Sequence, residues 1–215
     1  MKKYLYKINQ NVPKKLQMKP KVLTLREQKK KDRKEQILTE SMQLFAEKGF
    51  DNTTIADIVE ACGMARGTFY NYYTDTQTIL EELIQQINNR IIDLVKSIRK
   101  ENSSLEDFTL KSFQAFFEMV STPELAAFNH NNQSHIRTVS YSSNSMKLLI
   151  EILVEELKKQ PEIKLKQDLD FQLLTVMMVS GASEVFLHIR QSEIEVDINY
   201  LAQFMTHVFL HGVTK

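Results

Sequence analysis

The chain has 215 residues, enough for one or two domains with a substantial core, and 42% of them are hydrophobic. It contains few Gly and Pro and no sustained alternation of apolar and polar residues, which predicts an all-α fold. A single Cys excludes an internal disulfide, no apolar run reaches the ~18 residues that span a membrane, and the N-terminus lacks the apolar core of a secretory signal, so we expect a cytoplasmic protein with no membrane partner.

The net charge of +1 conceals a strong asymmetry along the sequence. Residues 1–36 contain 13 Lys and Arg against three Asp and Glu, a net of +10, whereas the remainder carries 15 basic and 24 acidic residues, a net of −9. A basic segment on an acidic body predicts a polyanionic partner at one end of the molecule. Residues 1–25, interrupted by Pro13 and Pro20, are expected to form either a solvated flexible tail or an arm whose lysines contact DNA.

Residues 26–80 are predicted to form a small helical domain that begins with a long helix. This helix is expected over about 26–48, with Lys in its first half and apolar residues at helical spacing in its second half. Gly49 ends it, and Phe50 can pack back onto it. A second long helix is expected to begin near Asp75 and to hold one apolar stripe for about five turns, enough to connect this domain rigidly to the rest of the chain.

A helix-turn-helix motif is predicted between these two long helices. A short helix over about 54–62 would take Thr53 or Thr54 as its N-cap, because the threonine hydroxyl can accept a free backbone N–H of the first turn. Gly63 can adopt the positive φ that redirects the chain, and a second short helix follows over about 65–72. Two short helices joined by a Gly-containing turn of about three to four residues are typical of this motif.

The second short helix carries residue types that recognise DNA. The guanidinium of Arg66 can pair with O6 and N7 of guanine, and Thr68 can offer a hydroxyl to a base and a methyl to thymine. Gly67 removes the side chain where helix and DNA approach, whereas Phe69 and Tyr73 are expected to point inward as anchors. The predicted DNA contacts are Thr53, Thr54, Ala65, Arg66, Gly67, Thr68, Tyr70, Asn71 and Tyr72, together with Lys29, Lys30 and Lys31 on the preceding helix.

The residues between Arg33 and Leu80 also carry a recognisable pattern. The pattern comprises Ile37-Leu38, Leu44 to Phe50, Thr53-Thr54, Ile58, Gly63, Gly67 to Tyr70 and Tyr72-Tyr73. In these residues and their spacing the chain resembles the DNA-binding domain of the TetR (tetracycline-repressor) family of bacterial transcription regulators. The resemblance implies a homodimer that recognises two operator half-sites, and a C-terminal core in which ligand binding changes the separation of the DNA-binding heads. The chain departs from the family pattern at Thr76, where Lys is usual, and at Ala65, where Ser is common.

Residues 81–215 are predicted to form a helical effector-binding and dimerisation domain, for a total of about nine helices. A Phe-rich helix should open at Ser104 and break at Pro123. The polar stretch 129–135 (NHNNQSH) is expected to be a loop, and a further helix should span about 143–159.

The last two predicted helices are candidates for a dimer interface. Residues 169–189 are apolar on nearly all sides, so a helix there must be buried on several of them, one against another subunit. Gly181, Ala182 and Ser183 would let a neighbouring helix approach closely, and the helix over 198–210 is its natural partner. The predicted interface residues are Met178, Gly181, Ala182, Val185, Phe204 and Val208.

Several aromatic residues in the middle of the chain are core residues that can also line an apolar ligand cavity between helices. The candidate ligand-binding residues are Phe113, Phe116, Phe117, Phe128, His135 and Tyr141. His130 and His135 lack a Cys or a close carboxylate that would complete a metal site, and His207 and His211 lack partners as well. Cys62 is expected to be a small core residue. No nucleophile–base set or phosphate loop indicates an enzyme, so neither a metal nor a cofactor is expected.

The sequence thus predicts a sequence-specific DNA-binding transcriptional regulator. In its leading form it is a homodimeric repressor that a small apolar or amphipathic effector releases from a palindromic operator in double-stranded DNA. The alternative is a DNA-binding regulator controlled by a protein partner, which predicts a filled C-terminal core with no cavity.

Overall fold

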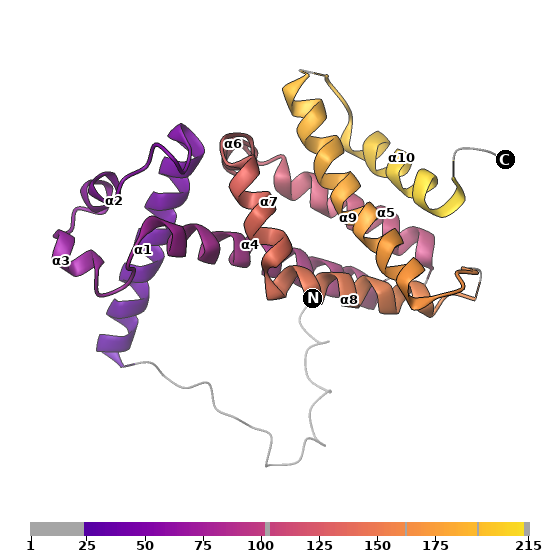
Figure 1. Cartoon of the computed structure of the whole chain (residues 1–215), viewed down its shortest axis with the longest axis horizontal. Helices are drawn as coiled ribbons and strands as arrows, with labels where there is room; N and C mark the ends of the chain where they lie inside the picture. The colour runs from indigo at the N-terminus through magenta and orange to yellow at the C-terminus, as the bar shows by residue number, and fades with distance from the viewer. Residues whose placement is uncertain (1–23, 102–103, 162, 193, 213–215) are drawn as a thin grey trace, which may run out of the picture. The chain divides into compact units, whose positions relative to one another are not determined.

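The computed structural model describes residues 24–101, 104–161, 163–192 and 194–212. Within these ranges the chain is all helical, with ten helices and no strand (Figure 1), which confirms the predicted fold class. The chain divides into two compact units, Met1–Gln36 and Ile37–Lys215. The predicted basic arm lies outside the described residues, except for its last two.

The helix-turn-helix consists of α2 (Ile55–Ala61) and α3 (Arg66–Phe69), which follow α1 (Leu25–Lys48) and precede α4 (Thr76–Glu101). These bounds agree with the predicted order of elements. The shared core of the motif includes Ile37, Leu38, Met42 and Phe45 of α1, Ile58 and Val59 of α2, Phe69 of α3, and Ile79 and Leu80 of α4. Cys62 is also buried in this core, as expected.

Local chemistry explains where the short helices begin and end. Gly49 and Gly63 have φ angles of +81° and +57°, which glycine adopts without a Cβ clash, so each can turn the chain at a helix end. Thr54 is the N-cap of α2: its hydroxyl accepts the backbone N–H of Asp57 at 3.3 Å. The Asp57 carboxylate accepts the backbone N–H of Thr54 at 2.7 Å in return. This reciprocal capping box satisfies two backbone donors at the start of a helix of only seven residues.

The C-terminal part of the chain is a bundle of packed helices. Its helices are α5 (Leu105–Val120), α6 (Pro123–Asn131), α7 (Gln133–Ser142), α8 (Asn144–Lys158), α9 (Asp168–Gln191) and α10 (Ile198–His211). Helix α10 lies along α5 (Figure 1), α8 packs on α9, and α4 packs on α5, α7 and α8. Helix α4 therefore belongs both to the core of the helix-turn-helix and to the C-terminal bundle.

The prediction of a loop over 129–135 is wrong. Helix α5 ends at Val120, before Pro123 as expected, and Pro123 is the first residue of a further helix, α6, where proline loses no hydrogen bond. Helix α7 follows after a single residue, Asn132, whose φ and ψ of −132° and 23° interrupt the helix. The additional helix raises the total in the described residues above the nine expected.

Helix α9 differs from the expectation for this segment. Among the described residues it is the one helix long and apolar enough, by length and composition alone, to cross a membrane, although no apolar run was expected to reach that length. Core helices of proteins without membrane segments pass the same test. Only 22% of its most apolar stretch is buried within the chain, and Leu169, Leu173 and Met177 leave one face of the helix exposed at a spacing of four residues.

Candidate nucleic-acid interface and ligand cavity

Helix α3 presents its polar residues on the surface of the motif. Ala65, Arg66, Gly67 and Asn71 are exposed, and Thr68 is half-buried. The guanidinium carbon of Arg66 lies 5.9 Å from the ring centroid of Tyr70, and its Nη2 donates a hydrogen bond to the Tyr70 hydroxyl at 3.4 Å. This contact braces Arg66 along the helix surface and leaves other guanidinium N–H groups available for a base edge.

A helix of four residues is not stable alone, so α3 depends on its anchors. Phe69 is fully buried and Tyr73 is 3% exposed, which confirms that both point inward. The Tyr73 hydroxyl donates to the carboxylate of Glu82 on α4 at 2.9 Å. Burial first, and this hydrogen bond second, raise the pKa of Tyr73 well above its ordinary value. The exposed face of α3 is therefore supported by α4. Helix α4 begins next to Asp75, as expected, and the Asp75 carboxylate accepts the backbone N–H of Thr78 at 2.8 Å.

The structure corrects one predicted DNA contact and places the others. Thr53 is buried and its hydroxyl donates to the carbonyl of Gly49 at 2.8 Å, so it shapes the loop after α1 and does not face DNA. Thr54 is exposed at the start of α2, and Tyr72 is half-buried against the core. The remaining predicted contacts are accessible: Tyr70, together with Lys29, Lys30 and Lys31 on α1.

Within the C-terminal bundle, a cavity of about 190 Å³ lies between α4, α5, α7, α8 and α9. Its apolar wall is formed by Ile87, Ile91, Val95, Phe108, Phe113, Phe116, Met146, Leu149, Leu153, Met178, Val179, Ala182 and Phe186. The predicted ligand-binding residues Phe113, Phe116 and Tyr141 line this cavity. The stripe of α4 that includes Ile87, Ile91 and Val95 was expected only to connect two domains, yet it also forms a cavity wall.

Three predicted ligand-binding residues do not line the cavity. Phe117 and Phe128 are fully buried by neighbouring side chains and serve as packing residues. His135 points away from the cavity: its Nε2 lies 3.1 Å from both carboxylate oxygens of Asp51, and its ring centroid lies 4.8 Å from that of Phe50. Its position on α7 brings it to the loop that follows α1.

The cavity wall also contains polar groups, some where the cavity meets solvent and one that is buried. Arg137 of α7 forms an ion pair with Glu184 of α9, and the Tyr141 hydroxyl forms a hydrogen bond with Ser180. Arg137, Glu184 and Tyr141 are all substantially exposed, so they lie where the cavity meets solvent. The hydroxyl oxygen of Ser112 is buried and has no hydrogen-bond partner among the described residues. It is a polar atom to which a ligand can bond without displacing another contact.

The predicted dimer-interface residues divide into two groups. Met178 and Ala182 are buried within their own chain and line the cavity, so neither is available to a second copy. A Cβ placed on Gly181 would lie 3.5 Å from the ring of Phe209, which shows that its neighbour is α10 of the same chain. Phe204 is half-exposed, and Val185 and Val208 are partly buried. The exposed apolar residues of this region are Leu169, Leu173 and Met177 on α9 with Tyr200 and Phe204 on α10, here called the α9/α10 apolar set.

An exposed short helix with polar side chains, held by buried residues of α1, α2 and α4, is the arrangement of a helix-turn-helix motif. Residues 37–83 match the family model described as "Bacterial regulatory proteins, tetR family". This match covers the second half of α1, the whole motif and the start of α4. Residues 37–83 are therefore similar to the DNA-binding domain of TetR-family transcriptional regulators.

Curated relatives match over part of the chain. An uncharacterised helix-turn-helix regulator of Bacillus subtilis, YvdT, is 32% identical over 62 residues, which cover 29% of this chain and 32% of the relative. IcaR of Staphylococcus epidermidis, a negative regulator of the biofilm operon icaADBC, is 23% identical over 118 residues, which cover 50% of this chain and 63% of the relative. The chain therefore spans about a third to two thirds of the length of these relatives.

Solved structures match over most of the chain and show the fold. The fatty acid degradation regulator FadR from Bacillus halodurans has a TM-score of 0.71 at 21% identity, covering 84% of this chain and 96% of that one. FadR from Bacillus subtilis, solved in complex with stearoyl-CoA, has a TM-score of 0.70 at 19% identity, covering 84% and 99% of the two chains.

Proposed function

We propose that the protein is a homodimeric repressor that binds a palindromic operator and leaves it when a small apolar or amphipathic ligand enters the cavity of the C-terminal bundle. The observation that carries the proposal is the cavity itself, because a regulator without a ligand was expected to have a filled core. Helix α4 links the two sites: Ile87, Ile91 and Val95 line the cavity, and Ile79 and Leu80 pack in the core of the helix-turn-helix. A ligand that moves α4 therefore moves the support of α3.

The volume of the cavity limits which ligands can enter it without movement of its walls. Its volume of about 190 Å³ is close to the roughly 150 Å³ of an apolar cavity that accepts benzene, and below the ~300–1,000 Å³ of most ligand pockets. A ring or a short alkyl chain fits, whereas a long chain such as that of stearoyl-CoA requires the walls to separate. The FadR structure with stearoyl-CoA supports an acyl ligand in this fold. A ligand of this kind would couple binding to a change of shape.

The α9/α10 apolar set supports the homodimer. Leu173 is 54% exposed, Met177 62% and Phe204 50%, and such large apolar side chains grouped on two helices favour burial against a partner. A second copy of the chain presents the same residues, as a two-fold symmetric interface requires. Dimerisation would also explain why only 22% of the most apolar stretch of α9 is buried within the chain.

The test compares octanoyl-CoA with stearoyl-CoA in two measurements, the melting temperature and the release of operator DNA. We expect at least one of them to raise the melting temperature and to release DNA, because a ligand that binds only the folded protein stabilises it by mass action. Ser112→Leu is the matched variant: it removes no hydrogen bond, and it places additional carbon atoms at the cavity wall. We expect it to bind DNA as the wild type does and to lose the response. A wild-type response retained in Ser112→Leu would contradict binding in this cavity.

A further inference from the structure

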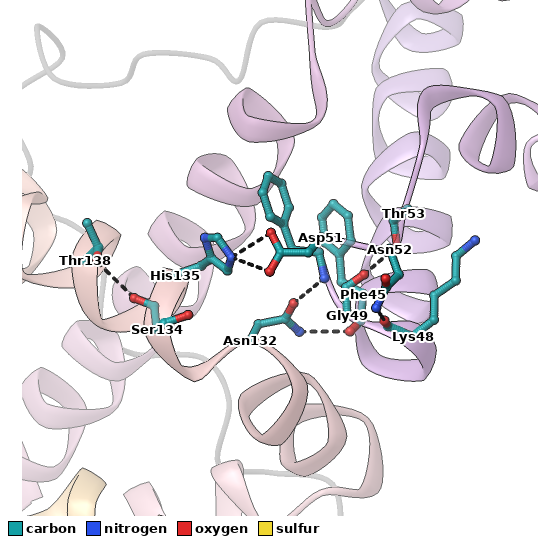
Figure 2. Close-up of polar contacts among 11 residues, drawn as sticks. Phe45, Lys48, Gly49, Asp51, Asn52, Thr53, Asn132, Ser134, His135 and Thr138 are labelled. Carbon is teal, nitrogen blue, oxygen red and sulfur yellow. Dashed lines mark hydrogen bonds and ion pairs between the residues drawn. The ribbon is translucent and has the colours of Figure 1, made fainter.

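The side chain of Asn132 forms hydrogen bonds to the C-terminal ends of both α1 and α6. Figure 2 shows its bond to Phe45 of α1. Asn132 is 1% exposed, and its Nδ2 donates to the carbonyl of Phe45 in α1 at 2.8 Å and to the carbonyl of Phe128 in α6 at 2.7 Å. Its Oδ1 accepts the backbone N–H of Phe50 at 2.6 Å. Both hydrogens of the amide NH2 group and the amide oxygen therefore have hydrogen-bond partners within the protein. These partners lie in α1 and directly after it on one side, and in α6 on the other.

Neighbouring residues tighten the same contact. Asn131 Nδ2 donates to the carbonyl of Ala46 at 2.6 Å. A Cβ placed on Gly49 would lie 3.2 Å from the carbonyl oxygen of Asn131, so the two backbones are close together. Figure 2 shows the contact between His135 Nε2 and the Asp51 carboxylate beside these bonds. We call this group of contacts the α1–α6 junction.

The chemistry of an amide suits this position. Phe45 and Phe128 belong to the last four residues of their helices, whose carbonyls carry the negative end of the helix dipole. The Phe45 carbonyl also accepts the backbone N–H of Gly49 at 3.1 Å, so Asn132 is a second donor to it. Two such ends repel each other unless a donor lies between them. The NH2 group of Asn132 has two hydrogens and supplies one to each helix. A carboxylate at the same position would add to the repulsion.

The junction also lies between the motif and the cavity. Phe45 packs in the same buried cluster as Ile58 and Phe69, so α1, α2 and α3 share one core. On the other side, α7 begins at Gln133, directly after Asn132, and Gln133 lines the cavity. A single peptide bond therefore separates the amide that holds α1 from the wall that a ligand would touch.

We propose that Asn132 is a positioning residue for DNA binding: it fixes the direction of α1 against the C-terminal bundle and thereby sets the half-site spacing that the protein accepts. This inference rests on the proposed homodimer, in which two motifs contact one operator. Each added base pair shifts a half-site by about 3.4 Å and rotates it by about 35°. A dimer with firmly held motifs tolerates such a shift poorly, and a dimer with loosened motifs tolerates it well.

The experiment measures affinity for the operator selected by the wild type and for versions with one base pair added or removed between the half-sites. The wild type should prefer the selected spacing. In Asn132→Ala we expect the ratio between selected and altered spacings to fall by about two- to thirtyfold, the range in which one residue modulates such coupling. The preference for each base within a half-site should stay unchanged, which a general loss of structure would not allow.

Two further variants keep the result interpretable. Asn52 Nδ2 donates to the carbonyl of Lys48 at 2.9 Å, so Asn52→Ala removes an amide from the end of α1 without touching α6, and it should keep the wild-type spacing preference. Asn131 is an exposed residue whose partly buried hydrogen bond to the Ala46 carbonyl is removed in Asn131→Ala. This variant should lose part of the preference even if Asn132→Ala fails to fold. Wild-type spacing preference in Asn131→Ala and in any folded Asn132→Ala would overturn the inference and leave the proposed repressor intact. A wild type with no spacing preference would overturn both.

Discussion

The carboxylate of Asp57 shows how one residue at a helix start affects stability. Lys48 Nζ lies 2.9 Å from it, and the pKa of Asp57 lies well below its ordinary value of 3.8, because Lys48 first and Thr54 second hydrogen-bond to the charged form. A lowered pKa in the folded state means that the unfolded chain binds a proton more readily. The stabilising effect of Asp57 is therefore fully present above pH 3.8 and is lost as the pH falls below it.

We predict that Asp57→Asn is less stable than the wild type at neutral pH and that the difference shrinks as the solution is acidified through pH 3.8. Urea unfolding at a series of pH values measures this difference directly. Glu60→Gln, on an exposed position of the same helix, controls for the change in net charge. A difference between Asp57→Asn and the wild type that is independent of pH would show that the carboxylate charge does not stabilise α2.

Gly49 and Gly63, both at helix ends, allow two effects of an added side chain to be compared: backbone strain and steric contact with a neighbour. Both Gly49 and Gly63 have positive φ, so Ala at either position carries the left-handed strain of roughly 1–2 kcal/mol. Nothing lies within 4 Å of a Cβ on Gly63, whereas a Cβ on Gly49 meets the carbonyl oxygen of Asn131 at 3.2 Å. We predict that Gly49→Ala destabilises the protein more than Gly63→Ala does, as measured by urea unfolding. Equal losses of stability in the two variants would mean that the α1–α6 junction shifts to accommodate the added Cβ at little cost.

The helix-turn-helix could be predicted from the sequence because its elements depend on neighbouring residues. Thr54 and Asp57 form their capping box within four residues, and Gly63 turns the chain by its own backbone freedom. The break between α6 and α7 could not be predicted in the same way. Asn132 was assigned to a polar loop because its type is polar, but it is buried by contacts with Phe45 and Phe50, more than 80 residues away in the sequence.

The ligand cavity could likewise be predicted only in part, because its lining depends on packing between residues distant in the sequence. An aromatic helix at residues 105–120 predicted an apolar wall, and Phe113 and Phe116 do line the cavity. The sequence could not separate them from Phe117, which lies next to Phe116 and is fully buried on another face of the helix. Which face of a helix borders empty space depends on how the neighbouring helices pack, and helical periodicity alone does not contain that information.

At the level of the whole molecule, the proposed recognition of two operator half-sites requires two chains, and we expect the α9/α10 apolar set to lie in the interface between them. Met177→Glu places a charge on the most exposed apolar residue of α9. A buried, unpaired carboxylate is costly in an interface, so we predict that this variant is monomeric at concentrations where the wild type is a dimer. Its affinity for the full operator should fall, because a monomer engages one half-site only. Analytical ultracentrifugation and operator titration measure the two effects separately.

Leu148→Glu is the matched control, because Leu148 is 43% exposed on α8 and lies outside the α9/α10 apolar set. It adds the same charge to an exposed leucine on another surface, and it should leave both the dimer and operator affinity unchanged. If Leu148→Glu dissociates the dimer and Met177→Glu does not, the two chains meet through α8 instead. If Met177→Glu is monomeric but binds the full operator like the wild type, DNA recognition does not depend on the dimer, and the two half-sites are occupied independently.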